Sequence, residues 1–356
     1  MCQPMDVLEN FPIPTAAVSC QRHGCGHINE TYQVVCQCGT RYILQKINHH
    51  VFKDVSGLME NISAITDYLS KQEPDPRKVL TLVPTKDGKS YYESADGCYW
   101  RVYVFVENSI CLEQAETPED FYESAVAFGN FQQMLKDFPA HILHETIPNF
   151  HDTRDRYRIF HEILEKDPMG RKAEVAEQIE FALAREEEAA TLVRLLEAGQ
   201  LPLRVTLNDT KLNNVMMDAD TRTALCVIDL DTVMPGLSLY DYGDAIRYGA
   251  ASAAEDETDL SKMQMRLDLF EIFTKGYLLA CPDLTPLERQ LLPLGAKLMT
   301  LECGVRFLTD YLDGDHYFSI HRPGHNLDRA KTQFKLVADM EEKWEEMDRI
   351  VRSFEF

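Results

Sequence analysis

The strongest constraint on the fold is a change of pattern near residue 108. Before that point, short runs of β-branched and aromatic residues alternate with glycine-containing turns, which is typical of an antiparallel sheet. One helix pattern interrupts them from about Asp54, and from Thr117, a good N-cap followed by Pro118, helical patterns dominate. We therefore expect an α+β protein of two lobes: residues 1–108 form an antiparallel sheet with one helix, and residues 109–356 form a larger, mostly helical lobe. The predicted strands are 16–20, 31–36, 41–47, 91–93 and 98–106.

The helical half contains two long helix patterns and one interruption. Interleaved Glu, Arg, Ala and Leu predict a helix over about residues 172–197 with a solvated charged face, and a final helix is expected over residues 328–354. Between residues 203 and 231, short apolar runs alternate with polar residues, which predicts short strands that carry loops. Asp241 and Asp244 lie before an apolar helix segment, and we expect one of them to cap it.

The charge balance excludes several classes of partner. The 356 residues carry a net charge of −22 at pH 7, and they contain no block of Lys and Arg that would attract nucleic acid or an anionic membrane. Neither a secretion signal nor a stretch of membrane-spanning length is recognisable, so we expect a cytoplasmic protein. The 10 cysteines are too dilute for a disulfide framework, and the cluster between Cys20 and Cys38 lacks the paired spacing of a zinc site.

Two polar loops in the interruption carry the most informative residues. The first places Asp209, Lys211 and Asn214 in the spacing D-x-K-x-x-N. Protein kinases use this spacing for a loop whose Asp accepts the proton of the substrate hydroxyl and whose Asn helps to hold magnesium. The second loop begins with Asp229 at the end of an apolar run, the position of the kinase aspartate that binds magnesium. Either Asp alone is explained as a turn residue, but together they favour phosphoryl transfer from ATP, whose phosphates need a metal held by oxygen ligands.

These loops and several further segments resemble the aminoglycoside phosphotransferase and choline kinase-like family of small-molecule kinases, and within it the N-acetylhexosamine 1-kinases. The further segments are residues 26–32, 42–48, 58–62 and 304–311. The resemblance implies a protein kinase-like fold that uses ATP and Mg²⁺ to phosphorylate the anomeric hydroxyl of N-acetylglucosamine or N-acetylgalactosamine. It implies that Asp209 is the base, that Asn214 and Asp229 bind the magnesium, and that Lys211 lies at the nucleotide.

The resemblance also implies sugar contacts and shows one departure. His27, Arg306 and Tyr317 are expected to contact the sugar together with Asp209; the structural alternatives are an exposed loop histidine and a buried ion pair beside a packed tyrosine. The family has a histidine two residues before the catalytic Asp, where this chain has Leu207, so the support of the loop must differ. Two other hypotheses stay open: a kinase of another small alcohol, such as an amino alcohol or an aminoglycoside, and a degenerate kinase that binds nucleotide without turnover. We expect a monomer or a weak homodimer.

The first lobe holds the expected nucleotide contacts. Gly24 and Gly26 lie between two strands, where their backbone N–H groups either cover the phosphates or form a plain hairpin turn. Kinase-like proteins place a lysine on the third strand, and only one of the adjacent Gln45 and Lys46 faces the nucleotide, because successive strand residues point to opposite faces. We favour Lys46. Glu60 on the following helix is either its ion-pair partner or an exposed helix residue.

Overall fold

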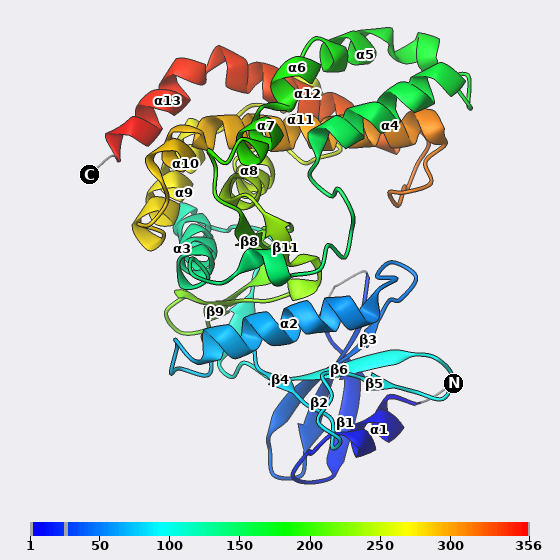
Figure 1. Cartoon of the computed structure of the whole chain (residues 1–356), viewed down its shortest axis with the longest axis vertical. Coiled ribbons are helices and arrows are strands. Elements are labelled where there is room, and N and C mark those ends of the chain that lie inside the picture. The colour runs from blue at the N-terminus through cyan, green and yellow to red at the C-terminus, as the bar shows by residue number, and fades with distance from the viewer. Residues whose placement is uncertain (1–2, 25–27, 355–356) are drawn as a thin grey trace. The chain divides into compact units, whose positions relative to one another are not determined.

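The computed structural model describes residues 3–24 and 28–354 (Figure 1). The chain divides into two compact units. The first comprises Met1–Cys111, Asp137–Pro148 and Asn214–Pro235, and the second comprises Leu112–Lys136, Asn149–Asn213 and Gly236–Phe356. The first unit therefore includes two segments from beyond residue 108, and the lobe boundary expected from the sequence pattern stays a prediction.

The first unit is built on an antiparallel sheet. Its strands are β1 (Ala17–Arg22), β2 (Glu30–Cys36), β3 (Arg41–Ile47), β4 (Leu82–Val83), β5 (Tyr92–Glu93) and β6 (Tyr99–Val104). They follow the order β1-β2-β3-β6-β4, and β5 also pairs with β6. The five strands predicted from the sequence are confirmed, and only the short β4 was not expected. The helical elements in the first two segments of this unit are α1 (Pro4–Val7), η1 (Leu8–Asn10), α2 (Val55–Ser70) and η2 (Ala140–Ile142).

The two faces of this sheet are covered by different elements. One face packs on α1 and η1 and contributes Leu44 and Trp100 to a buried apolar core. The opposite face of the sheet lies against α2 (Figure 1). On that face, Met59 Sδ is 3.8 Å from Arg101 Nη1. Because side chains alternate along a strand, Gln45, between Leu44 and Lys46, lies on the α2 face, and its register partner on β6 is Arg101.

A second, smaller sheet holds the segments that join this unit from later in the chain. β7 (Ser109–Cys111), β9 (Val215–Asp218) and β10 (Ala224–Val227) pair in the order β10-β9-β7, and the turn η5 (Leu230–Thr232) follows β10. Asn61 of α2 connects these segments, because its Nδ2 donates to Val233 O at 3.0 Å and to His144 O at 2.8 Å. The end of η5 is therefore tied directly to α2.

The second unit is mostly helical. Its helices are α3 (Pro118–Met134), α4 (Thr153–Lys166), α5 (Ala176–Leu183), α6 (Glu186–Ala189), α7 (Thr191–Glu197), α8 (Ser238–Gly249), α9 (Leu267–Ala280), α10 (Pro286–Gln290), α11 (Leu292–Asp313), α12 (His325–Glu342) and α13 (Trp344–Ser353). Shorter elements are η3 (Lys172–Val175), β8 (Arg204–Thr206) and η6 (Leu260–Lys262), while η4 (Leu212–Asn214) and β11 (Met234–Gly236) span the points where the chain passes from one unit to the other. Thr117 caps α3 as expected, in a reciprocal arrangement with Asp120. None of the helices in the described ranges is long and apolar enough to cross a membrane.

The helix expected over residues 172–197 is broken into η3, α5, α6 and α7, so that prediction was wrong. Side chains of α4 bind the carbonyl groups near the breaks. Tyr157 Oη donates to Ala182 O at 2.9 Å, and Thr153 Oγ1 donates to Ala189 O at 2.7 Å. These tertiary hydrogen bonds compete with the helical ones, and no periodicity within the segment reveals them.

The final helix is also divided, into α12 and α13, with Lys343 between them. Lys343 Nζ donates to Met265 O at 2.9 Å and pairs with Asp339 at 2.7 Å. The single helix expected over residues 328–354 was therefore wrong, because Lys343 is fixed by a segment from elsewhere in the second unit.

Candidate active site

Asp209 lies in the loop that follows β8. Asn208 before it has a left-handed backbone, with φ of 63°, a conformation that Asn tolerates better than most residues. Lys211 Nζ lies 2.8 Å from Asp209 Oδ1. Burial opposes the charge of Lys211, but the carboxylate of Asp209 outweighs it and raises the pKa of Lys211 above its ordinary value. The loop thus presents the carboxylate of Asp209 and the ammonium group of Lys211 as an ion pair.

Asp241 of α8 holds this loop in place. Its carboxylate accepts hydrogen bonds from the backbone N–H groups of Leu207 at 2.9 Å and Asn208 at 2.8 Å. Gln132 Nε2 adds a third bond at 2.8 Å. Burial raises the pKa of Asp241 to about 6, although these three hydrogen bonds act in the opposite direction. All three of these donors are neutral, and together with the charge interaction with His151 they offset only part of the effect of burial.

The expectation that Asp241 or Asp244 caps a helix was wrong. The N-cap of α8 is Leu237, and Asp244 forms a buried ion pair with Arg247 at 2.8 Å. The side chain of Leu207 is fully buried. The loop is therefore held at this position through the backbone N–H of Leu207, which donates to the carboxylate of Asp241 at 2.9 Å.

Asn214 and Asp229 lie at matching ends of two paired strands in the first unit. Val215 of β9 pairs with Val227 of β10, and one step further Ile228 N donates to Asn214 O at 2.9 Å. Asp229 has a left-handed backbone, with φ of 59° and ψ of 60°, which turns the chain from β10 into η5. An amide and a carboxylate on neighbouring strand ends are the hard oxygen donors that Mg²⁺ prefers, so these residues fit the expected metal.

The described residues contain no group of three or more His, Cys, Asp or Glu side chains that would hold a metal ion by themselves. Mg²⁺ in kinase-type sites is bound by one or two protein groups together with substrate phosphates. A small donor set such as Asn214 and Asp229 is therefore compatible with a metal that enters with a nucleotide.

The structure gives Lys46 a different partner from the one expected. Lys46 lies on the face opposite α2, and its Nζ is 3.4 Å from Glu30 Oε1. Glu60 is exposed, and its carboxylate is 2.8 Å from His144 Nε2. The expected Lys46–Glu60 ion pair is therefore absent, and Gln45 is the residue that faces α2. A nucleotide contact by Lys46 stays a prediction that this geometry disfavours.

Arg101 is a buried cation on the α2 face of the sheet, and sequence reasoning missed it. Its guanidinium binds both carboxylate oxygens of Asp231, with Nη2 to Oδ2 at 2.9 Å, and its Nε donates to Gln45 Oε1 at 2.9 Å. Asn29 Nδ2 donates to the same Asp231 carboxylate. Burial opposes the charge of Arg101, but Asp231 outweighs it and raises the pKa of Arg101. The only sequence signal is one charged residue within an otherwise apolar and aromatic strand.

Arg306 and Tyr317 lie close together in the second unit. The distance from Arg306 Nη2 to Tyr317 Oη is 3.5 Å, and the tyrosine is 66% exposed. The guanidinium of Arg306 also lies 5.1 Å from the ring of Phe150 and 5.5 Å from that of Phe318. Burial and then the charge of Arg306 lower the pKa of Arg156, so two guanidinium groups share this region. The buried ion pair and packed tyrosine considered as the alternative are not what the structure contains.

Asp310 holds the loop that carries Tyr317. Its carboxylate accepts hydrogen bonds from three successive backbone N–H groups, those of His316 at 2.9 Å, Tyr317 at 2.8 Å and Phe318 at 2.9 Å. Asn326 Nδ2 adds a fourth bond at 2.9 Å. The exposed position of Tyr317 therefore depends on a buried carboxylate of α11.

The glycine segment before β2 is described only in part. Gly24 is exposed and has φ of 72°, and apart from its neighbours in the chain no described residue has a heavy atom within 4 Å of the position a Cβ would take. Gly26 and His27 lie outside the described residues. A phosphate contact by Gly24 or Gly26 and a sugar contact by His27 stay predictions.

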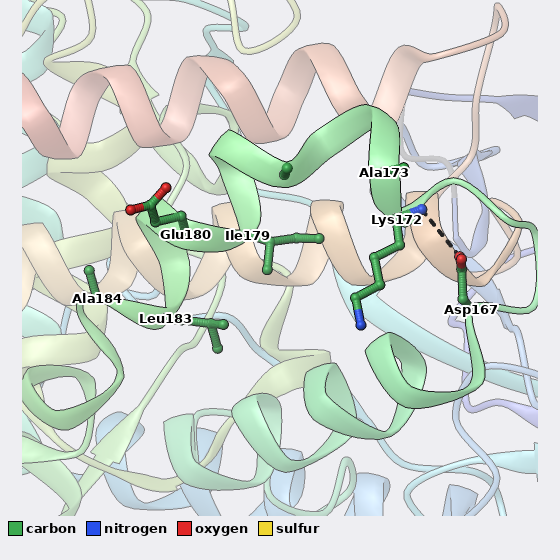
Figure 2. A pocket seen from close by; sticks show the side chains of 8 residues that line it. Asp167, Lys172, Ala173, Ile179, Glu180, Leu183 and Ala184 are labelled. Atoms are coloured by element: carbon green, nitrogen blue, oxygen red, sulfur yellow. Dashed lines mark hydrogen bonds between the residues drawn. The ribbon is translucent and has the colours of Figure 1, made fainter.

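A pocket of about 730 Å³ opens beside α5 (Figure 2). Ile179 and Leu183 lie on one side of it, and Lys172 N donates to Asp167 Oδ1 at its edge. None of the site residues predicted from the sequence lines this pocket. It is therefore distinct from the candidate active site.

The antiparallel sheet with its helix, the mostly helical remainder and the two polar loops define a kinase-like protein. Comparison with known families supports the same class: the model of the phosphotransferase enzyme family matches residues 19–270. The chain belongs to this aminoglycoside phosphotransferase family.

Solved structures share the fold at low sequence identity. An aminoglycoside phosphotransferase from Alicyclobacillus acidocaldarius has a TM-score of 0.62 and 14% identity over 99% of this chain and 96% of that chain. A microcompartment-associated aminopropanol kinase has a TM-score of 0.59 and 17% identity over 97% of each chain. An amicoumacin kinase in complex with AMP-PNP and Ca²⁺ has a TM-score of 0.56 and 14% identity over 91% of this chain and 88% of that chain. The kinase-like fold expected from the sequence is thereby confirmed.

Proposed function

We propose that this phosphotransferase moves the γ-phosphate of ATP to the anomeric hydroxyl of an N-acetylhexosamine, N-acetylglucosamine or N-acetylgalactosamine, and releases the sugar 1-phosphate and ADP. Membership of the family supports phosphoryl transfer to an alcohol. The observation that carries the assignment of roles is the pair of supported loops. One presents Asp209 beside Lys211 at 2.8 Å, and the other joins Asn214 to the strand that leads into Asp229.

Each residue has a chemical role in the proposal. Asp209 accepts the proton of the sugar hydroxyl as its oxygen attacks the γ-phosphorus. Asn214 and Asp229 hold Mg²⁺, which neutralises the charge of the phosphates when bound. Lys211 contributes a positive charge next to Asp209 and balances the negative charge that gathers during transfer.

The charge near Arg306 favours a neutral acceptor over a cationic one. Within the described residues, Arg306 Nη2 donates to Tyr317 Oη at 3.5 Å and Arg156 Nε donates to Phe150 O at 3.1 Å. The buried carboxylate of Glu302 lies near enough to both guanidinium groups for their charges to lower its pKa. Two neighbouring guanidinium groups repel an ammonium group but donate well to hydroxyl and acetamido oxygens, and the nearby Glu302 is already bound to His151 at 2.8 Å. In the proposal, Arg306 and Tyr317 bind the sugar and His27 adds a contact.

The test measures ADP release with ATP and Mg²⁺ across a panel of acceptors: the two N-acetylhexosamines, glucose, galactose, choline, an aminopropanol and kanamycin. Phosphorus NMR identifies the product. A phosphate at C1 of an N-acetylhexosamine is the expected result. Turnover on an amine-bearing acceptor alone would replace the sugar assignment, and nucleotide binding without any turnover would favour a degenerate kinase.

Asp209→Asn is the matched variant for this assay. It removes the base while keeping the size of the side chain, and we expect kcat to fall by roughly 10²–10⁴-fold. Thermal unfolding in the presence of ATP checks that the variant is folded and still binds nucleotide. Turnover equal to that of the parent protein would contradict the role of Asp209.

A further inference from the structure

We propose that Arg101 is a positioning residue that fixes the metal-binding Asp229 through the buried ion pair that Arg101 forms with Asp231. The inference rests on the proposed function, since it concerns how the metal-binding segment of that site is held. Arg101 would not touch the metal or the nucleotide. It would act through the turn η5, which directly follows Asp229.

Asp231 is bound from the sheet by two residues. Arg101 of β6 binds both of its carboxylate oxygens, an arrangement that fixes orientation as well as distance. Asn29, just before β2, donates to the same carboxylate and also accepts from Asn48 N at 3.0 Å. The side chains of Arg101 and Asp231 are only 1% and 4% exposed. The position of Asp231 is therefore determined by β6 and the start of β2.

Arg101 is itself held by neutral groups. Its Nε donates to Gln45 Oε1 at 2.9 Å, and its Nη1 lies 3.8 Å from Met59 Sδ. A lysine in place of Gln45 would put a second cation next to the guanidinium and would offer no acceptor. Gln45, at the position where a kinase-like lysine is expected, thus supplies the amide oxygen that accepts the hydrogen bond from Arg101.

The turn after Asp229 is fixed on both sides. Asp231 is bound to the sheet, and Val233 O accepts from Asn61 of α2 at 3.0 Å. Before the turn, Ile228 N donates to Asn214 O at 2.9 Å. Asp229 lies between these fixed points with a left-handed backbone, which persists only where the surroundings enforce it. Loss of Arg101 would remove the strongest of these restraints.

The test measures Mn²⁺ binding by electron paramagnetic resonance, using the full chain with a non-hydrolysable ATP analogue. Substitution of a residue that orients a metal ligand typically lowers metal affinity or activity by about 10–100-fold. We expect a loss of Mn²⁺ affinity of this size in Arg101→Met. Arg101→Lys should recover part of it, because it keeps the charge but lacks the two parallel donors. The Mg²⁺ concentration that gives half-maximal turnover should rise in Arg101→Met and rise less in Arg101→Lys.

Two further variants separate positioning from general stability. Arg101→Met combined with Asp231→Asn leaves no unpaired buried charge, so it should fold better than Arg101→Met while Mn²⁺ binding stays weak. Arg204→Met is the matched control, because Arg204 forms a similarly buried pair with Glu288 in the second unit, Nη2 to Oε2 at 2.7 Å. It should lower stability and leave Mn²⁺ affinity at the parent value.

Parent-like Mn²⁺ affinity in folded Arg101→Met, or in the double variant, would overturn the inference. A parent protein that binds Mn²⁺ with the nucleotide analogue but phosphorylates no acceptor would overturn the proposed function alone, and the Mn²⁺ titrations would still decide the role of Arg101. Absence of Mn²⁺ binding by the parent protein would overturn both.

Discussion

Asp231 in the first unit and Asp241 in the second are buried to the same degree, with 3% and 2% exposure, but they are stabilised in opposite ways. Asp231 faces the guanidinium of Arg101, whereas Asp241 accepts only from neutral N–H donors. Both carboxylates hold segments that carry candidate catalytic residues. The difference teaches that a buried carboxylate can be held by a single strong partner or by several weak ones, and that these two solutions respond differently to mutation and pH.

Substitution of Arg101 tests how strongly Asp231 depends on its single charged partner, and it gives the largest expected effect on stability. Arg101→Met leaves Asp231 buried and unpaired, which should lower the free energy of unfolding by about 3–5 kcal/mol. Gln132→Leu removes one neutral donor from Asp241 and should cost about 1–3 kcal/mol. Urea unfolding of both variants provides the measurement. If Arg101→Met lowers the free energy of unfolding by no more than Gln132→Leu does, the proposed difference between the two carboxylates is wrong.

The pH dependence of stability tests the environment of Asp241, which is buried and bound by neutral donors. Burial raises the pKa of Asp241 from its ordinary 3.8 to about 6. The unfolded chain loses this proton at the lower pH, so the free energy of unfolding should fall as the pH rises from about 4 to about 6, by about 3 kcal/mol from this residue. His151 lies close enough to oppose the shift. Urea unfolding at several pH values, with Asp241→Asn as the variant that lacks the group, measures the contribution. Identical slopes for the two proteins would contradict it.

Asp241→Asn should also affect the loop that carries Asp209 without affecting the metal-binding segment that carries Asp229. An amide accepts on one oxygen only, so one of the N–H donors of Leu207 and Asn208 loses its partner, and the loop with Asp209 shifts. Small displacements of a catalytic group cost about 100-fold, and we expect kcat to fall by this amount while Mn²⁺ affinity stays unchanged. Steady-state kinetics and Mn²⁺ titration check both parts. A parallel loss of Mn²⁺ affinity would show that the two carboxylates do not act on separate loops.

Asp310 extends the comparison to a third buried carboxylate and gives the smallest effect. Like Asp241 it accepts only neutral donors, but the loop it holds carries Tyr317. Asp310→Ala should raise the KM of the acceptor about 10-fold, the equivalent of one lost hydrogen bond of about 1.4 kcal/mol, and change kcat little. Thr309→Ala removes only a bond within α11 and is the matched control. A loss of kcat without a change in KM would exclude a role in acceptor binding.

Local sequence patterns were sufficient for the fold class, the strands of the sheet and the start of α3. These features depend on side-chain periodicity and on caps such as Thr117, which act within a few residues. The spacing of Asp209, Lys211 and Asn214 is equally local, and so it identified the loop, although the roles of these residues stay predictions. The two predicted long helices were wrong for the same reason. Their breaks involve contacts with distant segments, such as Tyr157 Oη with Ala182 O and Lys343 Nζ with Met265 O, which a local pattern does not contain.

The arrangement behind the two loops was decided only by the tertiary structure. Arg101 and Asp231 are separated by 130 positions, and Asp241 reaches back over 34 positions to Leu207, so no window of sequence contains either contact. The face of Gln45 depends on which side of the sheet α2 covers, and alternation alone leaves that choice open. Periodicity specifies what a segment forms, whereas the burial of a charge is decided by groups that meet only when distant segments pack together.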